Sequence, residues 1–280
     1  MSTNRGGMDQ PEGETGATRA AREAQAAEQE REEQETVQEP QREEQRPSEE
    51  LQIEAVMAVV AHPDDAEFGC GATLAKFARE GKRTYVVVCT AGNKGTPDPE
   101  MRDEDLAAIR RREQLAASAE LGVTETIFLD NPDGELFPTL EFREQIVRQI
   151  RTYRPDVVLT HDPFRPYSLH PDHRAVGITT TDAVYPTARD AIYFPQHYQE
   201  GLEPWKVGEI WYYGAEKPDH WVDIADTFER KIAALEHHDS QVGRSTDLAG
   251  RLRERAAEVA KESGQDLELA EAYKVVKMRR

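Results

Sequence analysis

Short apolar runs alternate with longer amphipathic stretches along the chain from about residue 52 to residue 242. The runs at 55–60 and 85–90 are almost continuously apolar, which is typical of strands buried on both faces of a parallel sheet. Further strands are expected at 126–129, 155–160, 209–213 and 221–224. Helical spacing predicts helices between them, at 69–79, 103–121, 139–153, 172–185 and 227–239.

Strands that alternate with helices at this spacing indicate consecutive βαβ units. Crossovers between parallel strands are right-handed, so successive helices cover both faces of the sheet. The predicted fold is therefore α/β, a doubly wound, Rossmann-like three-layer sandwich with a mostly parallel sheet. In open sheets of this kind, ligands bind beyond the carboxyl ends of the strands.

The two ends of the chain differ from this central part. Residues 1–50 contain no Phe, Trp, Tyr, Ile or Leu and carry 14 acidic and 6 basic residues, which predicts a disordered acidic tail. Residues 51–242 are expected to form the folded domain. Residues 243–280 are polar with a weak helical pattern, and we expect a helical segment that packs either on the domain or on another subunit.

The net charge of the chain argues against some classes of binding partner. The chain has 54 acidic and 35 basic residues, a formal net charge of −19, which argues against binding to nucleic acid or to an anionic membrane surface. No apolar run approaches the roughly 20 residues that span a bilayer, and the N-terminus has no apolar signal core. We therefore expect a cytoplasmic protein that acts on a small molecule; a homo-oligomer is compatible with the sequence.

Unusual polar residues follow two of the predicted strands. The first strand runs into His62-Pro-Asp-Asp65, and the fourth runs into His161-Asp162, followed by a loop with His170-Pro-Asp-His173. Imidazole and carboxylate groups together suit a divalent metal such as zinc. Two His-Pro-Asp triplets at matching crossovers therefore predict a metal site. For His161 itself, the sequence favours a hydrogen-bonded histidine at a strand end.

These motifs resemble those of a known enzyme family. The segment 61–73, which reads AHPDDAEFGCGAT, together with the second triplet at 170–173, is similar to the PIG-L/LmbE family of zinc deacetylases. Such enzymes remove acetyl groups from N-acetylglucosamine-type conjugates. The resemblance extends from about residue 56 to residue 241 and includes looser matches at 110–117, 133–136 and 231–241.

The resemblance implies a role for individual residues. The zinc ligands would be His62, Asp65 and His173. Asp64 would be the general base and His170 would stabilise the oxyanion or act as the acid. This assignment agrees with the chemistry of amide hydrolysis, in which zinc lowers the pKa of a bound water and a nearby carboxylate accepts its proton.

The residues expected to face the sugar are Arg110 and Asp133. The family often has an acidic residue in the loop after the second strand, in a Gly-Glu-x-Gly pattern. Here Asn93 and Lys94 stand in that loop, so the contacts to substrate are expected to differ from the family pattern.

Two other functions fit the same motifs. One is a metal-dependent esterase or phosphatase on this scaffold, but a phosphatase would normally show more ligands and a second metal. The other is a non-catalytic sugar-binding protein that retains the metal. The intact Asp64 argues against the latter, because a binding protein does not need a general base beside its metal ligand.

Overall fold

The structure is a computed structural model that describes residues 51–278. The predicted acidic tail at 1–50 lies outside the described residues. Within them, a seven-stranded sheet has the order β3-β2-β1-β4-β5-β7-β6. The strands, in chain order, are β1 Ala55–Val60, β2 Arg83–Thr90, β3 Glu125–Asn131, β4 Val157–His161, β5 Glu209–Tyr213, β6 His220–Asp223 and β7 Ala270–Lys277.

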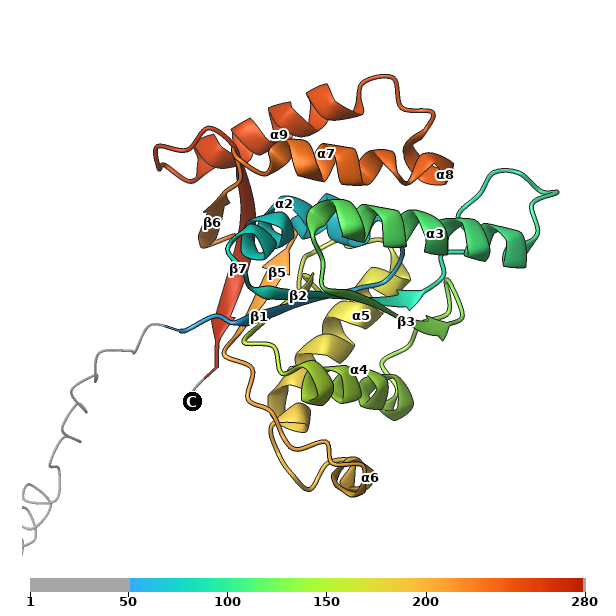
Figure 1. The fold of residues 1–280 in the computed structure, drawn as a ribbon, viewed down its shortest axis with the longest axis vertical. Coiled ribbons are helices and arrows are strands. Elements are labelled where there is room, and N and C mark those ends of the chain that lie inside the picture. The colour runs from blue at the N-terminus through green and yellow to red at the C-terminus, as the bar shows by residue number, and fades with distance from the viewer. Residues whose placement is uncertain (1–50, 279–280) are drawn as a thin grey trace, which may run out of the picture. The chain divides into compact units, whose positions relative to one another are not determined.

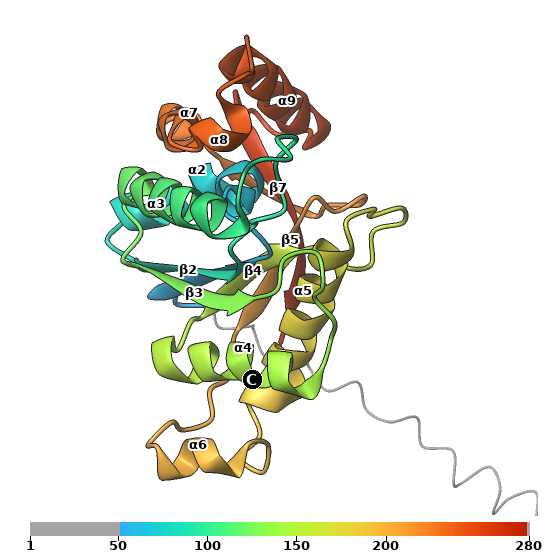
Figure 2. The ribbon, with the colours of Figure 1, turned by 90° about the vertical axis from the view of Figure 1, so that its right-hand side faces the viewer.

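The helices cover both faces of this sheet (Figures 1 and 2). In chain order they are α2 Asp65–Arg79, α3 Asp103–Leu121, α4 Leu140–Tyr153, α5 Pro171–Asp182, the π-helix η1 Ala183–Ala188, α6 Pro195–Gln199, α7 Phe228–Glu236, α8 Asp239–Val242 and α9 Leu248–Glu262. Helices α2, α3, α7 and α9 lie on one side and α4 and α5 on the other. None of these segments is both long and apolar enough to span a lipid bilayer.

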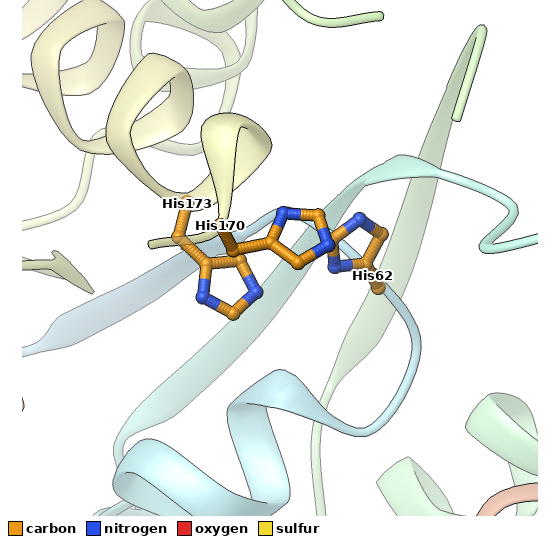
Figure 3. A group of neighbouring side chains, drawn as sticks. All are labelled: His62, His170 and His173. Atoms are coloured by element: carbon orange, nitrogen blue, oxygen red, sulfur yellow. The ribbon is translucent and has the colours of Figure 1, made fainter. Parts of the chain in front are cut away.

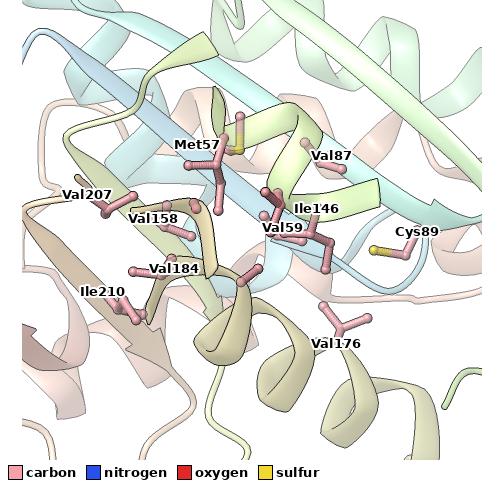
Figure 4. Packing of buried hydrophobic residues seen from close by; sticks show 14 of the residues in the cluster. Met57, Val59, Val87, Cys89, Ile146, Val158, Val176, Val184, Val207 and Ile210 are labelled. Carbon is pink, nitrogen blue, oxygen red and sulfur yellow. The ribbon is translucent and has the colours of Figure 1, made fainter. Parts of the chain in front are cut away.

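The alternation of side chains along β1 explains why the strand is apolar at every position. Met57 and Val59 point into the core beneath α4 and α5, where they join Ile146 and Val176 (Figure 4). Their neighbours Val56 and Ala58 belong to the opposite cluster, under α2 and α7. All six residues of β1 are fully buried. The five strands β3, β2, β1, β4 and β5 pair in parallel in that order, and helices cover both faces of the sheet, so the predicted three-layer sandwich is confirmed.

The C-terminal segment corrects one expectation. Helix α9 agrees with the predicted helical pattern, but residues 270–277 form β7, which pairs antiparallel with β5 on one side and β6 on the other. The segment therefore belongs to the domain's own sheet. Only alternate residues such as Tyr273 and Val275 pack into the core, while Lys274 pairs with Asp219 at the surface. The interleaved charges conceal the strand in the sequence.

A residue of β7 supplies hydrogen-bond partners at an irregular point in α2. Cys70 leaves helical geometry at φ −150°, which frees backbone groups on both sides of it. Glu271 accepts hydrogen bonds from the amides of Ala72 (3.2 Å) and Thr73 (2.9 Å). Lys231 donates to the carbonyl of Phe68 (2.9 Å) and to Glu271 (2.6 Å). This buried ion pair satisfies the groups that the break leaves open.

Replacing Glu271 by alanine is expected to lower the free energy of unfolding by about 3–5 kcal/mol, because it leaves the buried Lys231 ammonium without its counter-charge. Equilibrium denaturant unfolding measures the change. The exposed Glu268, which is three residues earlier, provides the control through Glu268→Ala. Equal stability of the two variants would contradict this role of the pair.

Candidate metal centre and active site

The two His-Pro-Asp motifs meet at the carboxyl ends of β1 and β4. His62 lies in the loop after β1, Asp65 is the first residue of α2, and His170 and His173 belong to the start of α5. Figure 3 shows the three imidazoles side by side, with His170 directed toward His62. The ring centroids are 4.6 Å apart for His62 and His170 and 5.3 Å for His62 and His173. The motifs are 108 residues apart and nevertheless form one cluster.

Asp65 lies at the centre of this cluster. Its Oδ2 is 3.3 Å from His62 Nδ1, and its Oδ1 is 3.2 Å from His173 Nε2. A tetrahedral zinc with bonds of about 2.0–2.1 Å places its donor atoms about 3.3 Å apart, so these distances fit the metal. Burial alone would raise the pKa of Asp65, but the surrounding histidines hold it well below its usual range. The donor set therefore fits a divalent cation.

His161 joins the same cluster, which the sequence left undecided. Its Nε2 is 3.4 Å from Asp65 Oδ2, and its ring stacks on His173 at a centroid distance of 4.0 Å. Burial lowers the pKa of His161, so the ring is neutral near pH 7. Its position beside the carboxylate suits a group that orients Asp65.

Two carboxylates contact the far side of the His62 ring. Asp133 Oδ1 and Asp172 Oδ2 each lie 3.2 Å from His62 Nε2. Burial would lower the pKa of His62, but hydrogen bonds to Asp133 and Asp65 outweigh it and raise the pKa to about 10. A carboxylate behind a metal-binding histidine fixes its orientation and strengthens it as a ligand. Nδ1 faces Asp65 on the opposite side of the ring, and a metal bound there would displace its proton.

Asp133 was expected to face the sugar, and the structure places it differently. It is 6% exposed and accepts a hydrogen bond from the Lys94 amide at 2.8 Å, besides its contact with His62. The Lys94 side chain pairs with the exposed Glu135. Asp133 therefore connects the unusual loop after β2 with the metal cluster.

Asp172 was not singled out from the sequence, although it is the aspartate of the second His-Pro-Asp triplet. It is fully buried and accepts hydrogen bonds from the amides of Gly134 (2.8 Å) and Leu136 (3.2 Å). The repeat of the triplet was the signal that could have identified it. Asp64 is the equivalent residue of the first triplet, so the two aspartates have different surroundings despite the shared motif.

Replacing Asp172 by asparagine is expected to weaken metal binding by about 10–100-fold, because the amide cannot accept all of these hydrogen bonds and His62 loses a charged partner. Competition with a chromophoric chelator measures the affinity. The exposed Asp130 offers a matched control, and Asp130→Asn should bind metal as the parent does. Unchanged affinity in the Asp172 variant would show that Asp133 alone orients His62.

Asp64 lies beside the cluster in an unusual backbone conformation, with φ at 91°. Its Oδ2 is 3.2 Å from Arg110, which also donates to the carbonyls of Pro63 (2.6 Å) and Gly92 (2.8 Å). Burial and the neighbouring Asp65 raise the pKa of Asp64 to about 7, against the opposing effect of Arg110. Arg110, expected to face the sugar, is 4% exposed and directs its hydrogen bonds to this loop.

A cleft of about 790 Å³ opens from the cluster. Asp65, His161 and His173 line its inner part, and it continues past Tyr213 toward Arg255 on α9. His170 is exposed beside the cluster, and its Nδ1 accepts a hydrogen bond from the Asp172 amide at 3.2 Å. The proton of a neutral His170 is therefore on Nε2, where it can be donated to a ligand.

The sequence of this chain is similar to that of several known enzymes. Residues 57–184 match the family described as PIG-L: GlcNAc-PI de-N-acetylase. The chain is 38% identical to the diacetylchitobiose deacetylase of Thermococcus kodakarensis, over 68% of this chain and 70% of that protein. It is 31% identical to the mycothiol S-conjugate amidase of Streptomyces coelicolor, over 65% and 75% of the two chains.

The fold is likewise similar to a solved structure of this group. The N,N'-diacetylchitobiose deacetylase of Pyrococcus horikoshii superposes with a TM-score of 0.74 and 29% identity, covering 81% of this chain and 87% of that one. By their names, these relatives are two deacetylases of diacetylchitobiose and an amidase of mycothiol S-conjugates. With 38% identity over more than two thirds of a deacetylase, and with both His-Pro-Asp motifs in one cluster, this chain belongs to the PIG-L family.

Proposed function

We propose that this protein is a zinc-dependent deacetylase that hydrolyses the N-acetyl amide of an N-acetylglucosamine-type sugar conjugate. The observation that supports it most is the position of Asp65 between His62 and His173, with the carboxylate of Asp64 next in the chain. This combination supplies a three-ligand metal site and a separate base. Such a site is what hydrolysis of an unreactive amide requires.

In this proposal the metal ligands are His62, Asp65 and His173. Bound zinc would polarise the amide carbonyl and make a coordinated water more acidic. Asp64 accepts the proton of the attacking water, and its pKa of about 7 suits a base that works near neutral pH. Arg110 keeps that carboxylate in place from α3.

His170 stabilises the oxyanion. Burial and the charges of His62 and His173 lower the pKa of His170, so it is neutral near pH 7 and donates from Nε2. Its exposure at the mouth of the cluster lets it reach a substrate. Asp133 acts mainly through His62, and its negative charge also favours the cationic amine product.

The substrate class follows from what the relatives share. One acts on diacetylchitobiose and another on mycothiol conjugates, and the family description names an N-acetylglucosamine lipid. The cleft toward α9 has room for the part of a conjugate beyond the acetylated sugar. We propose a small N-acetylated sugar conjugate as the substrate.

The experiment is a panel assay for acetate release by zinc-loaded protein. N-acetylglucosamine, diacetylchitobiose and a glucosaminyl-inositol acetamide represent the proposed class, and an acetyl ester and a phosphate monoester represent other hydrolases. Release of acetate from at least one sugar amide, abolished by a chelator and restored by zinc, supports the proposal. Turnover of the ester or the phosphate without any amide hydrolysis would contradict it.

A further inference from the structure

We infer that Gln114 is a positioning residue for Asp64, and that the buried pair of Glu67 and His238 holds Gln114 in place. The inference rests on the proposed function in that it assigns Asp64 the role of base. It adds three residues to the catalytic apparatus, none of which touches the metal ligands' side chains in the described structure.

The backbone of Asp64 needs such support. Its φ of 91° is in the left-handed region, which costs free energy for a residue other than glycine. Asp64 and the ligand Asp65 are adjacent, so rotation of the intervening peptide would move the base relative to the metal position. A left-handed conformation persists only where surrounding contacts impose it.

Gln114 makes the contact that imposes it. Its Oε1 accepts a hydrogen bond from the Asp64 amide at 3.0 Å. Gln114 lies one turn after Arg110 on α3, and Arg110 contacts the carboxylate of the same residue at 3.2 Å. One helix face therefore holds Asp64 at two points, the peptide and the side chain.

Gln114 is itself fixed by a buried acid. Its Nε2 donates to Glu67 Oε1 at 2.7 Å and to Ser118 Oγ at 3.1 Å, and its side chain is fully buried. The bond to Glu67 determines which end of the amide faces Asp64, because only the carbonyl end can accept the Asp64 N–H.

His238 completes the set from a distant part of the chain. Its Nε2 lies 3.4 Å from Glu67 Oε2, and both side chains are 0% exposed. The imidazole is the group that faces the second oxygen of Glu67, as a close contact without a hydrogen bond. Residue 238 lies beyond the segment 57–184 that matches the family profile, so the C-terminal part contributes to the orientation of the base.

The test begins with Gln114→Met, which keeps the length of the side chain and removes its three hydrogen bonds, to Asp64, Glu67 and Ser118. We expect kcat to fall by about 10–100-fold, the usual cost of a displaced catalytic group, with KM and zinc content close to those of the parent. The thermal midpoint should fall, because the buried Glu67 loses a donor, but the variant should remain folded at the assay temperature. Gln145 on α4, which accepts from Asn131, gives the matched control Gln145→Met. An unchanged kcat, or a loss explained by zinc loss or unfolding, overturns the inference.

A reciprocal exchange separates positioning from packing. Gln114→Glu alone places two carboxylates together and should lower kcat. Adding Glu67→Gln restores a donor to the pair, so that the carboxylate introduced at position 114 again accepts from the Asp64 amide, and kcat should recover to within about tenfold of the parent. Packing alone would give no recovery, and a double variant as slow as Gln114→Glu therefore refutes the inference.

The inference about Gln114 can be tested even if the proposed substrate class is wrong. If the parent hydrolyses no N-acetylated sugar, the proposed function fails and the inference is tested by crystal structures of parent and Gln114→Met. Asp64 should leave the left-handed region in the variant only. Retention of φ near 91° in the variant would show that Gln114 does not impose it.

Discussion

Replacing Asp64 by asparagine should lower kcat by about 10²–10⁴-fold while zinc stays bound, because the amide keeps the size of the side chain but cannot accept the proton of water. Arg110 can still contact the remaining side-chain oxygen, so the loop should keep its structure. Acetate release and zinc content are measured on the same preparation.

The neighbouring substitution, Asp65→Asn, should give the opposite pattern. Asp65 contacts both His62 and His173, and a neutral amide is a weak zinc ligand, so metal and activity should be lost together. Zinc loss in the Asp64 variant with zinc retained in the Asp65 variant would mean that the two roles are exchanged. Full activity of Asp64→Asn would refute the mechanism.

Removal of either histidine ligand should abolish zinc binding. The parent is expected to hold about one zinc per chain. His62→Ala and His173→Ala should each weaken zinc binding by more than the roughly 10–100-fold expected for Asp172→Asn, which changes only a residue that orients a ligand. Two of the three donors cannot hold the ion at the strength of the complete site.

Metal analysis after dialysis against a weak chelator tests this expectation. His237 is exposed after α7, so His237→Ala controls for the loss of an imidazole as such. Full zinc occupancy in both ligand variants would refute the ligand assignment. Occupancy in one of them would show that another donor replaces the lost imidazole, and His161, 3.4 Å from Asp65, and His170, beside His62, are the two candidates.

The core of the fold was predictable because its signals are local. The apolar run at 55–60 and the glycine after α3 correspond directly to β1 and to the end of that helix at Leu121. Strand β7 was not predictable, because its partners β5 and β6 are more than 45 residues away and its polar positions interrupt the apolar pattern. Long-range pairing of that kind leaves no periodic trace.

In the candidate site, the residues that belong to a sequence motif were predictable and the others were not. The motifs predicted that His62, Asp65, His170 and His173 lie close together, and the structure shows each of them in contact with another of the four. The environments of Arg110 and Asp133 were not predictable, since they depend on which loops fold over them. Gln114 belongs to no recognisable sequence motif. Its hydrogen bond with Asp64 joins residues 50 positions apart, so only the three-dimensional structure reveals it.

The position of β7 has a consequence for synthesis of the protein on the ribosome. This strand lies between β5 and β6 in the sheet, but it follows all the other elements of the described residues in the chain. Until it emerges, β5 presents an open edge, β6 has no neighbour in the sheet, and Lys231 lacks the carboxylate of Glu271. The nascent chain can fold from its N-terminal units first, but the sheet closes only after residues 270–277 have emerged. A ribosome stalled before residue 270 should therefore expose a strand edge that chaperones can recognise.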